Sequence, residues 1–255
     1  MFATSSPPTN RLLKLLRNSP PGIPLTSSAL NAVGIGADSV YHYVKGGYLK
    51  RLGHGVVALP SDEITPWGAV KALQNDFPQL HVAARSALSL YGIVHNLYVS
   101  DEIILFGPNR MVLPKWAQTF KIRYRCDNLF DFSDDEGLQL NDKTLKACPL
   151  SPFRLTTSVP ERAVIEMLYE AGTLQDYEEA ENLFNSLINP RKRLFGQLLS
   201  RCRSKKAIRL FFKFAKRTTL LGFDPMELKT SFPIDSGTPF CWSIKANNRR
   251  VVLCP

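Results

Sequence analysis

The sequence predicts an α+β protein in which an N-terminal winged helix-turn-helix precedes a larger mixed domain with a small sheet and a C-terminal helical bundle. Three observations predict it: helical periodicity broken by paired glycines before residue 60, Val-, Ile-, Tyr- and Phe-rich segments between residues 81 and 135, and helical periodicity beyond residue 152. We expect a first domain at 1–62 and a second at 63–255, with its mixed part at 63–150 and its helical part at 151–255.

Two helices are predicted to open the first domain. The first carries leucines at 12, 13, 15 and 16, is capped by Thr9 or Asn10, and stops before Pro20. The side-chain oxygens of residues 26–28 can cap the second helix. Gly34-Ile35-Gly36 ends that helix, because glycine accepts a positive φ while the isoleucine anchors the turn in the core.

A third helix and a hairpin complete the predicted winged helix. The helix begins near Ala37 and ends at Gly46-Gly47. Its period places Ala37, Val40, Tyr41 and Val44 on the buried side and Asp38, Ser39, His42 and Lys45 on the polar side. Residues 48–59, with the turn Gly53-His54-Gly55, predict the hairpin that forms the wing.

The rest of the chain predicts strands first and then helices. Helices are expected at 66–75 and 83–90, and extended segments at 96–106, 109–113 and 120–125. Ser158-Val159-Pro160-Glu161 predicts a capping box that opens a helix. Asp176, Asn189-Pro190 and Ser204 are predicted to open three more, and four helices in series favour antiparallel neighbours.

Several motifs resemble one protein family. Residues 26–34, 38–40, 46–53 and 57–60 resemble the N-terminal domain of the AbiEi family, the antitoxins of bacterial type IV toxin-antitoxin systems. Residues 84–88, 92–95 and 113–116 are similar to its middle segment, and residues 159–166, 189–191 and 198–202 to its C-terminal helices. The chain departs from the family in lacking a clear glycine-rich strand signature near its C-terminus, where residues 236–239 are the only candidate.

The resemblance implies a DNA-binding antitoxin and transcriptional autorepressor. In that family the N-terminal domain binds inverted repeats in its own promoter. The C-terminal domain counteracts a nucleotidyltransferase-like toxin, without a stable complex between the two. The implied partners are therefore double-stranded promoter DNA and the cognate toxin, with no cofactor and no membrane.

Composition agrees with a polyanionic partner. The 255 residues carry a formal net charge of +10, and 44% of them are hydrophobic, which is enough for a core. An anionic membrane surface would favour the same sign of charge, but no apolar run approaches the ~20 residues that cross a bilayer. Residues 1–8 lack the features of a signal peptide, so we expect a cytoplasmic protein. The five cysteines lack C-x-x-C spacing and the four histidines are scattered, which predicts reduced thiols and no metal.

The third helix and the hairpin supply the candidate DNA contacts. They are Ser39, His42, Tyr43, Lys45, Lys50, Arg51 and His54. Ser39 and His42 suit base edges, and Tyr43 suits a phosphate or a thymine methyl group. Lys45 suits the charge of the DNA backbone, and the hairpin residues Lys50, Arg51 and His54 suit phosphates or the minor groove. A winged helix that contacts protein, with these side chains merely solvated, is the alternative.

A second candidate surface is the basic segment, residues 191–217. Its cations are Arg191, Lys192, Arg193, Arg201, Arg203, Lys205, Lys206, Arg209, Lys213, Lys216 and Arg217. No acidic residue lies between Glu181 and Asp224, so we expect the charge to be uncompensated and to face an anionic partner. DNA, transfer RNA and an acidic face of the toxin all remain open.

Two other functions stay as alternatives. One is a stand-alone winged-helix regulator whose C-terminal domain binds a ligand or oligomerises. The other is a nuclease that uses the E-x-K pattern of Glu227 and Lys229, although no suitable upstream carboxylate precedes it. Residues 134–136 are interpreted as a solvated turn rather than a cation site, and the sequence lacks P-loop, dinucleotide and G-x-S-x-G motifs. We therefore expect no enzyme.

Overall fold

The computed structural model describes residues 10–94, 102–108, 110–151, 153–172, 174–218, 221–237, 242–246 and 249–253. The protein is α+β, as predicted. It forms two compact units: Met1–Leu80 with Met111–Tyr124, and His81–Arg110 with Arg125–Pro255. The expected domain boundary after residue 62 lies inside the first unit, which also recruits a segment from the middle of the chain.

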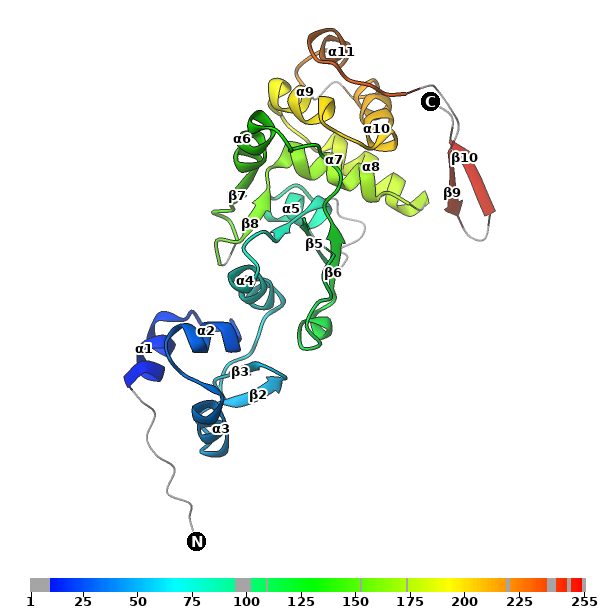
Figure 1. Cartoon of the computed structure of the whole chain (residues 1–255). Helices are drawn as coiled ribbons and strands as arrows, with labels where there is room; N and C mark the ends of the chain where they lie inside the picture. The colour runs from blue at the N-terminus through cyan, green and yellow to red at the C-terminus, as the bar shows by residue number, and fades with distance from the viewer. Residues whose placement is uncertain are drawn as a thin grey trace. The chain divides into compact units, whose positions relative to one another are not determined.

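The first unit combines short helices with a three-stranded sheet (Figure 1). Its elements are α1 (Asn10–Asn18), β1 (Leu25–Thr26), α2 (Ser27–Ala32), α3 (Ala37–Lys45), β2 (Lys50–Gly53), β3 (Val56–Ala58), α4 (Pro66–Asp76) and the 3-10 helix η1 (Ala117–Phe120). The strands pair in the order β1-β3-β2, and both pairings are antiparallel.

The capping residue, the helix-ending glycines and the buried isoleucine of this unit have the roles that the sequence predicts. Thr26 caps α2 through a hydrogen bond that its side chain accepts from the Ala29 N–H. Gly34 has φ +74° and Gly47 has φ +76°, values that glycine adopts readily, so α2 and α3 end where expected. Ile35 is buried in the core between the two helices. That core consists of Leu12, Leu25, Leu30, Ile35, Tyr43, Leu49 and Val57.

The segment Met111–Tyr124 packs against the hairpin β2–β3. Trp116 is 8% exposed, and a Cβ atom placed on Gly53 would lie 3.0 Å from the Trp116 Cβ. A strand was expected at 109–113, and this prediction is wrong for its described residues, 110–113, which have no regular structure. Pro114 instead begins a turn in which its carbonyl accepts the Ala117 N–H.

Four strands of a five-stranded mixed sheet lie in the second unit, and the fifth, Ile122–Cys126, begins in the first unit and ends in the second. The strands of this sheet are β4 (His81–Val82), β5 (Ile103–Gly107), β6 (Ile122–Cys126), β7 (Leu145–Ala147) and β8 (Thr156–Ser158), in the order β6-β5-β4-β8-β7. The β4–β8 pair is parallel, whereas β4–β5 and β7–β8 are antiparallel. The predicted extended segments at 96–106 and 120–125 thus correspond to β5 and β6, with residues 95–101 outside the described part. A separate antiparallel hairpin joins β9 (Trp242–Ala246) to β10 (Arg249–Leu253).

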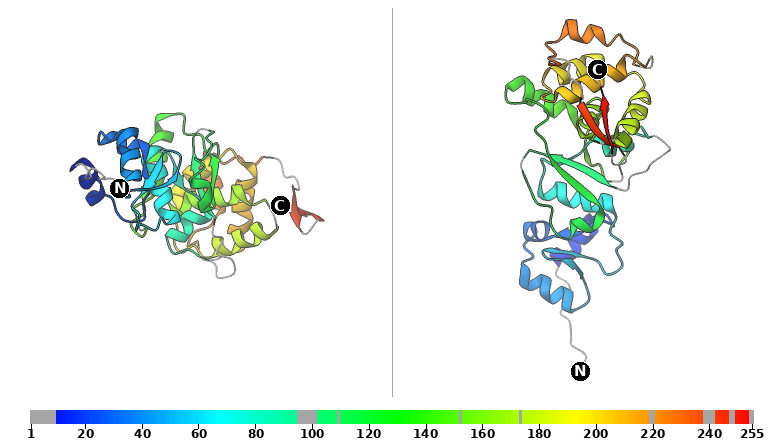
Figure 2. Two further views of the ribbon diagram at one scale, coloured as in Figure 1. Left: turned by 90° about the horizontal axis from the view of Figure 1, so that it is seen from below. Right: turned by 90° about the vertical axis from the view of Figure 1, so that its right-hand side faces the viewer.

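The second unit also contains helices, and the later ones gather around α7 (Figure 2). They are α5 (Ala84–Leu90), α6 (Asp135–Thr144), α7 (Pro160–Glu170), α8 (Leu174–Asn185), α9 (Lys192–Ser200), α10 (Lys205–Ala215) and α11 (Met226–Ser231). Residues 161–168 of α7 are all buried, because α5, α8, α9 and α10 contact it. This confirms the predicted series of four packed helices, α7–α10.

Three helix starts differ from their predicted form. The N-cap of α7 is Val159, and Ser158 instead donates a hydrogen bond to Glu166 at 2.8 Å, so the predicted capping box does not form. Asp134 caps α6 by accepting the Gly137 N–H, so residues 134–136 open a helix rather than a solvated turn. Asp176 lies inside α8, where it accepts the Gly172 N–H. Ser204 caps α10 as predicted.

None of the described helices is long and apolar enough to span a membrane.

Candidate nucleic-acid interface

The exposed face of α3 is determined by the burial of one of its two tyrosines. Tyr43 is 5% exposed and belongs to the core, whereas Tyr41 is 56% exposed. The Tyr43 carbonyl also accepts the N–H groups of Tyr48 and Leu49, which fixes the chain after α3 against this position. Tyr43 therefore cannot reach DNA while the domain is folded. This corrects the prediction that placed Tyr43 outside and Tyr41 inside.

The remaining polar residues of α3 lie mostly on its exposed side. Asp38, His42 and Lys45 are exposed, and Ser39 is half-buried at the edge of the helix. The rings of Tyr41 and His42 are 5.7 Å apart in an edge-to-face arrangement. The exposed face of α3 thus offers an aromatic ring, an imidazole and an ammonium group together.

The hairpin presents two of the three side chains that were predicted to contact DNA. Arg51 and His54 are exposed. Lys50 is different, because its ammonium group donates hydrogen bonds to the backbone carbonyls of Pro60, at 3.2 Å, and Asp62, at 2.5 Å. Lys50 therefore joins β2 to the chain that follows the hairpin, and its ammonium group is engaged by these two carbonyls rather than free for DNA.

The tip of the hairpin is fixed to α2. The Gly55 carbonyl accepts both the backbone N–H of Ser27, at 2.8 Å, and the Ser27 hydroxyl, at 3.1 Å. Gly55 has φ +72°, which a residue with a side chain would rarely adopt. These bonds fix the turn that carries His54 against the start of α2.

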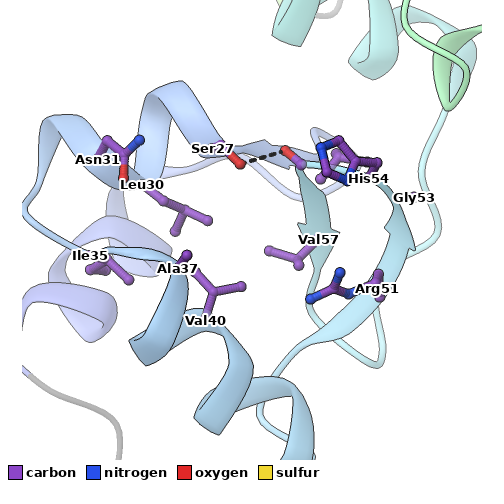
Figure 3. A pocket seen from close by; sticks show the side chains of 12 residues that line it. Ser27, Leu30, Asn31, Ile35, Ala37, Val40, Arg51, Gly53, His54 and Val57 are labelled. Atoms are coloured by element: carbon purple, nitrogen blue, oxygen red, sulfur yellow. Dashed lines mark hydrogen bonds between the residues drawn. The ribbon is translucent and has the colours of Figure 1, made fainter.

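A groove of about 290 Å³ lies between α2, α3 and the hairpin, and we call it the α3–hairpin groove (Figure 3). Its walls include Ala37 and Val40 on one side and Arg51 and Val57 on the other. Its lining residues are Ser27, Leu30, Asn31, Ile35, Ala37, Val40, Arg51, Gly53, His54, Gly55, Val56 and Val57. All of them belong to the first unit.

Positive charge is concentrated in the first unit. Its 94 residues hold ten Lys or Arg and four Asp or Glu, for a formal charge of +6. The 161 residues of the second unit carry only +4. Because phosphate neutralisation is the sequence-independent part of DNA binding, the first unit is the electrostatically favoured one.

The basic segment of the second unit is compensated, contrary to expectation. Six of its cations form ion pairs. These join Arg191 to Glu161, Lys192 to Glu227, Arg201 to Asp134 and Glu136, Arg203 to Asp131, Lys205 to Asp235, and Arg217 to Glu181. The acidic partners lie outside the segment in sequence, so a charge count between residues 181 and 224 could not find them.

The other cations of the segment are also largely engaged. Lys206 donates to the carbonyls of Tyr169 and Ala171. Arg209 is 8% exposed and donates to the Ser236 carbonyl. The Lys213 ammonium lies 5.5 Å from the centre of the Tyr177 ring. Only Arg193 and Lys216 are exposed and without an ion pair among the described residues.

Two of the carboxylates that pair with this segment, Glu161 and Asp134, show how these pairs lower a pKa. Burial raises the pKa of Glu161, but hydrogen bonds from the Arg191 guanidinium and backbone N–H outweigh it and lower the pKa overall. The pKa of Asp134 is lowered chiefly by its hydrogen bond from Arg201. These two groups are therefore charged at neutral pH and offset the charges of Arg191 and Arg201.

The residues of the nuclease alternative do not converge. Glu227 pairs with Lys192, while the Lys229 ammonium lies 4.5 Å from the centre of the Phe212 ring. In the part of the chain that the structure describes, no group of three His, Cys, Asp or Glu side chains has the arrangement of a metal site. Burial raises the pKa of Cys202 to about 11, so this thiol is protonated and unreactive at neutral pH.

Comparison with known proteins defines the family. The model of the AbiEi antitoxin N-terminal domain, described as a transcriptional regulator, matches residues 9–99. The model described as "Transcriptional regulator, AbiEi antitoxin, Type IV TA system" matches residues 100–231. The chain belongs to the AbiEi antitoxin family. No curated protein matches the chain.

A solved structure shares the architecture of this chain. The crystal structure of the Rv2827c protein from Mycobacterium tuberculosis superposes with a TM-score of 0.59 at 15% sequence identity. The alignment covers 96% of this chain and 92% of that one, so nearly the whole fold is shared. The N-terminal family match ends at residue 99, which leaves the Trp116 segment outside it although that segment packs in the same unit.

Proposed function

We propose that this AbiEi antitoxin binds promoter DNA through α3 and the hairpin β2–β3, which together form a winged helix. The observation that carries the proposal is that Tyr41, His42 and Lys45 of α3 are exposed, as are Arg51 and His54 of the hairpin in the same unit. The net charge of +6 on this unit supplies the attraction to phosphates. The family's description as transcriptional regulators supports the same function.

Each group has a role that its chemistry suits. An α-helix fits the major groove, where His42 can exchange hydrogen bonds with base edges and Tyr41 can contact a thymine methyl group. Lys45 lies one turn from Tyr41 and neutralises a phosphate. Arg51 and His54 extend the contact along the backbone or into the minor groove. Ser39 stays at the margin of this surface, because it is half-buried.

The second unit is proposed to carry the antitoxin activity. Family membership supports autorepression by the first unit and opposition to a nucleotidyltransferase-like toxin by the second. Neither activity requires catalysis, so we propose a non-enzymatic protein that acts in the cytoplasm. Because the basic segment is paired within the unit, we do not propose it as a nucleic-acid surface.

Salt dependence tests the DNA contacts. Affinity for a duplex carrying the protein's own promoter is measured by fluorescence anisotropy at several salt concentrations. Lys45→Ala and Arg51→Ala should each reduce the salt slope by about one unit, as expected for one lost phosphate contact. Lys71→Ala, on α4 in the same unit, is the matched control and should leave the slope unchanged. An unchanged slope in both interface variants would refute the proposed contacts.

Co-expression tests the antitoxin activity separately. Full-length protein is expressed with the nucleotidyltransferase-like gene that lies beside its own, and cell growth is measured. The double variant Lys45→Ala/Arg51→Ala should still restore growth while losing promoter repression, because the two activities reside in different units. Absence of such a gene, or toxicity that the wild-type protein does not relieve, would contradict the antitoxin proposal.

A further inference from the structure

We propose that the α3–hairpin groove is a binding site for a small organic anion with an apolar body, such as an aromatic carboxylate, and that its occupancy competes with DNA. The binding site itself stands on the geometry of the groove. The competition rests on the proposed DNA-binding function, because it needs Arg51 to contact DNA.

The interior of the groove suits an apolar ring. Leu30, Ile35, Val56 and Val57 are buried apolar residues of its lining, and Val40 of the same lining is half-buried. Its volume of about 290 Å³ is close to the lower bound of ~300 Å³ for small-molecule sites. An apolar ring that displaces water from this surface gains the usual free energy of burial.

The edge of the groove suits a negative charge. Arg51 extends from β2 toward the space beside α3, and His54 lies at the turn of the hairpin (Figure 3). Asn31 adds an amide group from α2, and none of the lining residues is acidic. A guanidinium binds a planar carboxylate through two parallel hydrogen bonds, which favours a carboxylate over a spherical anion.

The same residues link the ligand to DNA binding. A carboxylate on Arg51 would occupy the donors that the phosphate backbone needs, and the apolar body would fill the space next to Ala37 at the start of α3. A ligand that weakens DNA binding must itself be bound more weakly by the DNA complex, by the same factor. The groove would therefore act as the site of an inducer that releases the promoter.

Three probes test the apolar interior and the positively charged edge of the groove separately. The full-length protein is titrated by calorimetry with 1-naphthoate, with uncharged 1-naphthamide and with inorganic phosphate. We expect 1-naphthoate to bind at least about tenfold more tightly than either of the others, since each of them lacks one of the two features. Equal affinity for 1-naphthamide would show that the site does not recognise the negative charge of the carboxylate. Equal affinity for phosphate would show that the apolar interior does not contribute to binding.

Variants locate the binding. Arg51→Met keeps the length of the side chain and removes its charge, and Ala37→Leu narrows the groove at its mouth. Both should weaken 1-naphthoate binding at least about tenfold, while the matched control Lys71→Met, which lies outside the groove, should not. Thermal melting of each variant reports whether it is folded. Unchanged binding in both folded groove variants would overturn the site.

Competition completes the test. Labelled promoter duplex is titrated with protein in the presence of 1-naphthoate or 1-naphthamide, and only the first should raise the apparent Kd for DNA. If the free protein binds DNA but 1-naphthoate neither binds nor competes, the inference fails and the DNA-binding function stands. If 1-naphthoate binds in the groove while the protein binds no DNA, the proposed function fails and the ligand site stands.

Discussion

Two tyrosines on α3, separated by one residue, face opposite sides of the helix. A helical residue advances about 100°, so positions 41 and 43 differ by about 200°. Tyr43 packs with Leu12, Leu25 and Leu49, and Tyr41 is left in solvent. The sequence could predict the helix and its amphipathic character. It could not decide which tyrosine is buried, because both combine an apolar ring with a hydroxyl and the core partners come from distant segments.

Replacing each tyrosine with alanine should separate stability from DNA binding. Tyr43→Ala removes a buried ring and should lower the free energy of unfolding of the first unit by about 3–5 kcal/mol, by analogy with other buried aromatic residues. Tyr41→Ala should weaken promoter binding while changing that free energy by about 0.5 kcal/mol or less, since its side chain is exposed. Chemical denaturation and fluorescence anisotropy measure the two effects. A Tyr41→Ala variant with wild-type affinity would refute the proposed face of α3.

The hairpin is an element whose position depends on contacts at two places. Its tip is bonded to Ser27 through the Gly55 carbonyl, and Gly53 lies against Trp116. The glycines and the alternating pattern predicted the hairpin itself. The contact with Trp116 was not predictable, because that residue lies in a segment far along the chain and outside the predicted first domain.

Adding a methyl group at Gly53 should therefore disturb the hairpin. In Gly53→Ala the new Cβ would lie 3.0 Å from the Trp116 Cβ and 3.8 Å from its Cα, so the hairpin and the Trp116 segment must move apart. We expect promoter affinity to fall about tenfold as Arg51 and His54 are displaced. Gly36→Ala is the control, because its added methyl group meets nothing within 4 Å. Anisotropy titrations with equal affinity for wild-type and Gly53→Ala would show that the contact does not position the hairpin.

At the scale of the whole molecule, the first unit has a net charge of +6, whereas the basic segment of the second unit is largely paired with carboxylates. The total of +10 was visible in the sequence, but its distribution depends on acidic residues that folding brings to the basic segment. The double variant Arg193→Ala/Lys216→Ala, which removes the two exposed cations without ion pairs among the described part of the segment, should leave the salt slope of promoter binding unchanged. The slope is measured as for Lys45→Ala. A decrease of the salt slope by one to two units would instead indicate that the second unit contacts DNA phosphates.

The second unit contains a buried ion pair on α7. Counting charges along the sequence could not predict it. Arg162 and Glu166 of α7 are both 0% exposed, and their side chains are joined by a 2.8 Å hydrogen bond. Arg162 also donates to Asp127, and Glu166 accepts hydrogen bonds from Ser158 and the Ala84 N–H. These bonds connect α7 with the start of α5 and with the end of β8, so the pair links the helices to the sheet.

Removing one partner of the pair should be costly. Glu166→Gln leaves the Arg162 charge buried with less compensation and should lower the free energy of unfolding of the second unit by about 3–5 kcal/mol at neutral pH. Glu136→Gln is the control, because Glu136 is exposed and its 3.5 Å contact with Arg201 is solvated, so its effect should be small. Both are measured by urea denaturation. Equal effects would show that burial of the pair is not what stabilises this unit.

The same pair predicts how stability depends on pH. Burial raises the pKa of Glu166, but hydrogen bonding to His81 and the charge of Arg162 outweigh it and lower the pKa from 4.5 to about 2. The folded state therefore favours the carboxylate, and its contribution is complete above pH 4.5 and is lost as the pH falls toward 2. A shift of this size corresponds to about 3 kcal/mol. Urea denaturation between pH 2 and pH 7 should show a steeper acid loss for wild-type protein than for Glu166→Gln, whereas parallel curves would contradict the assignment.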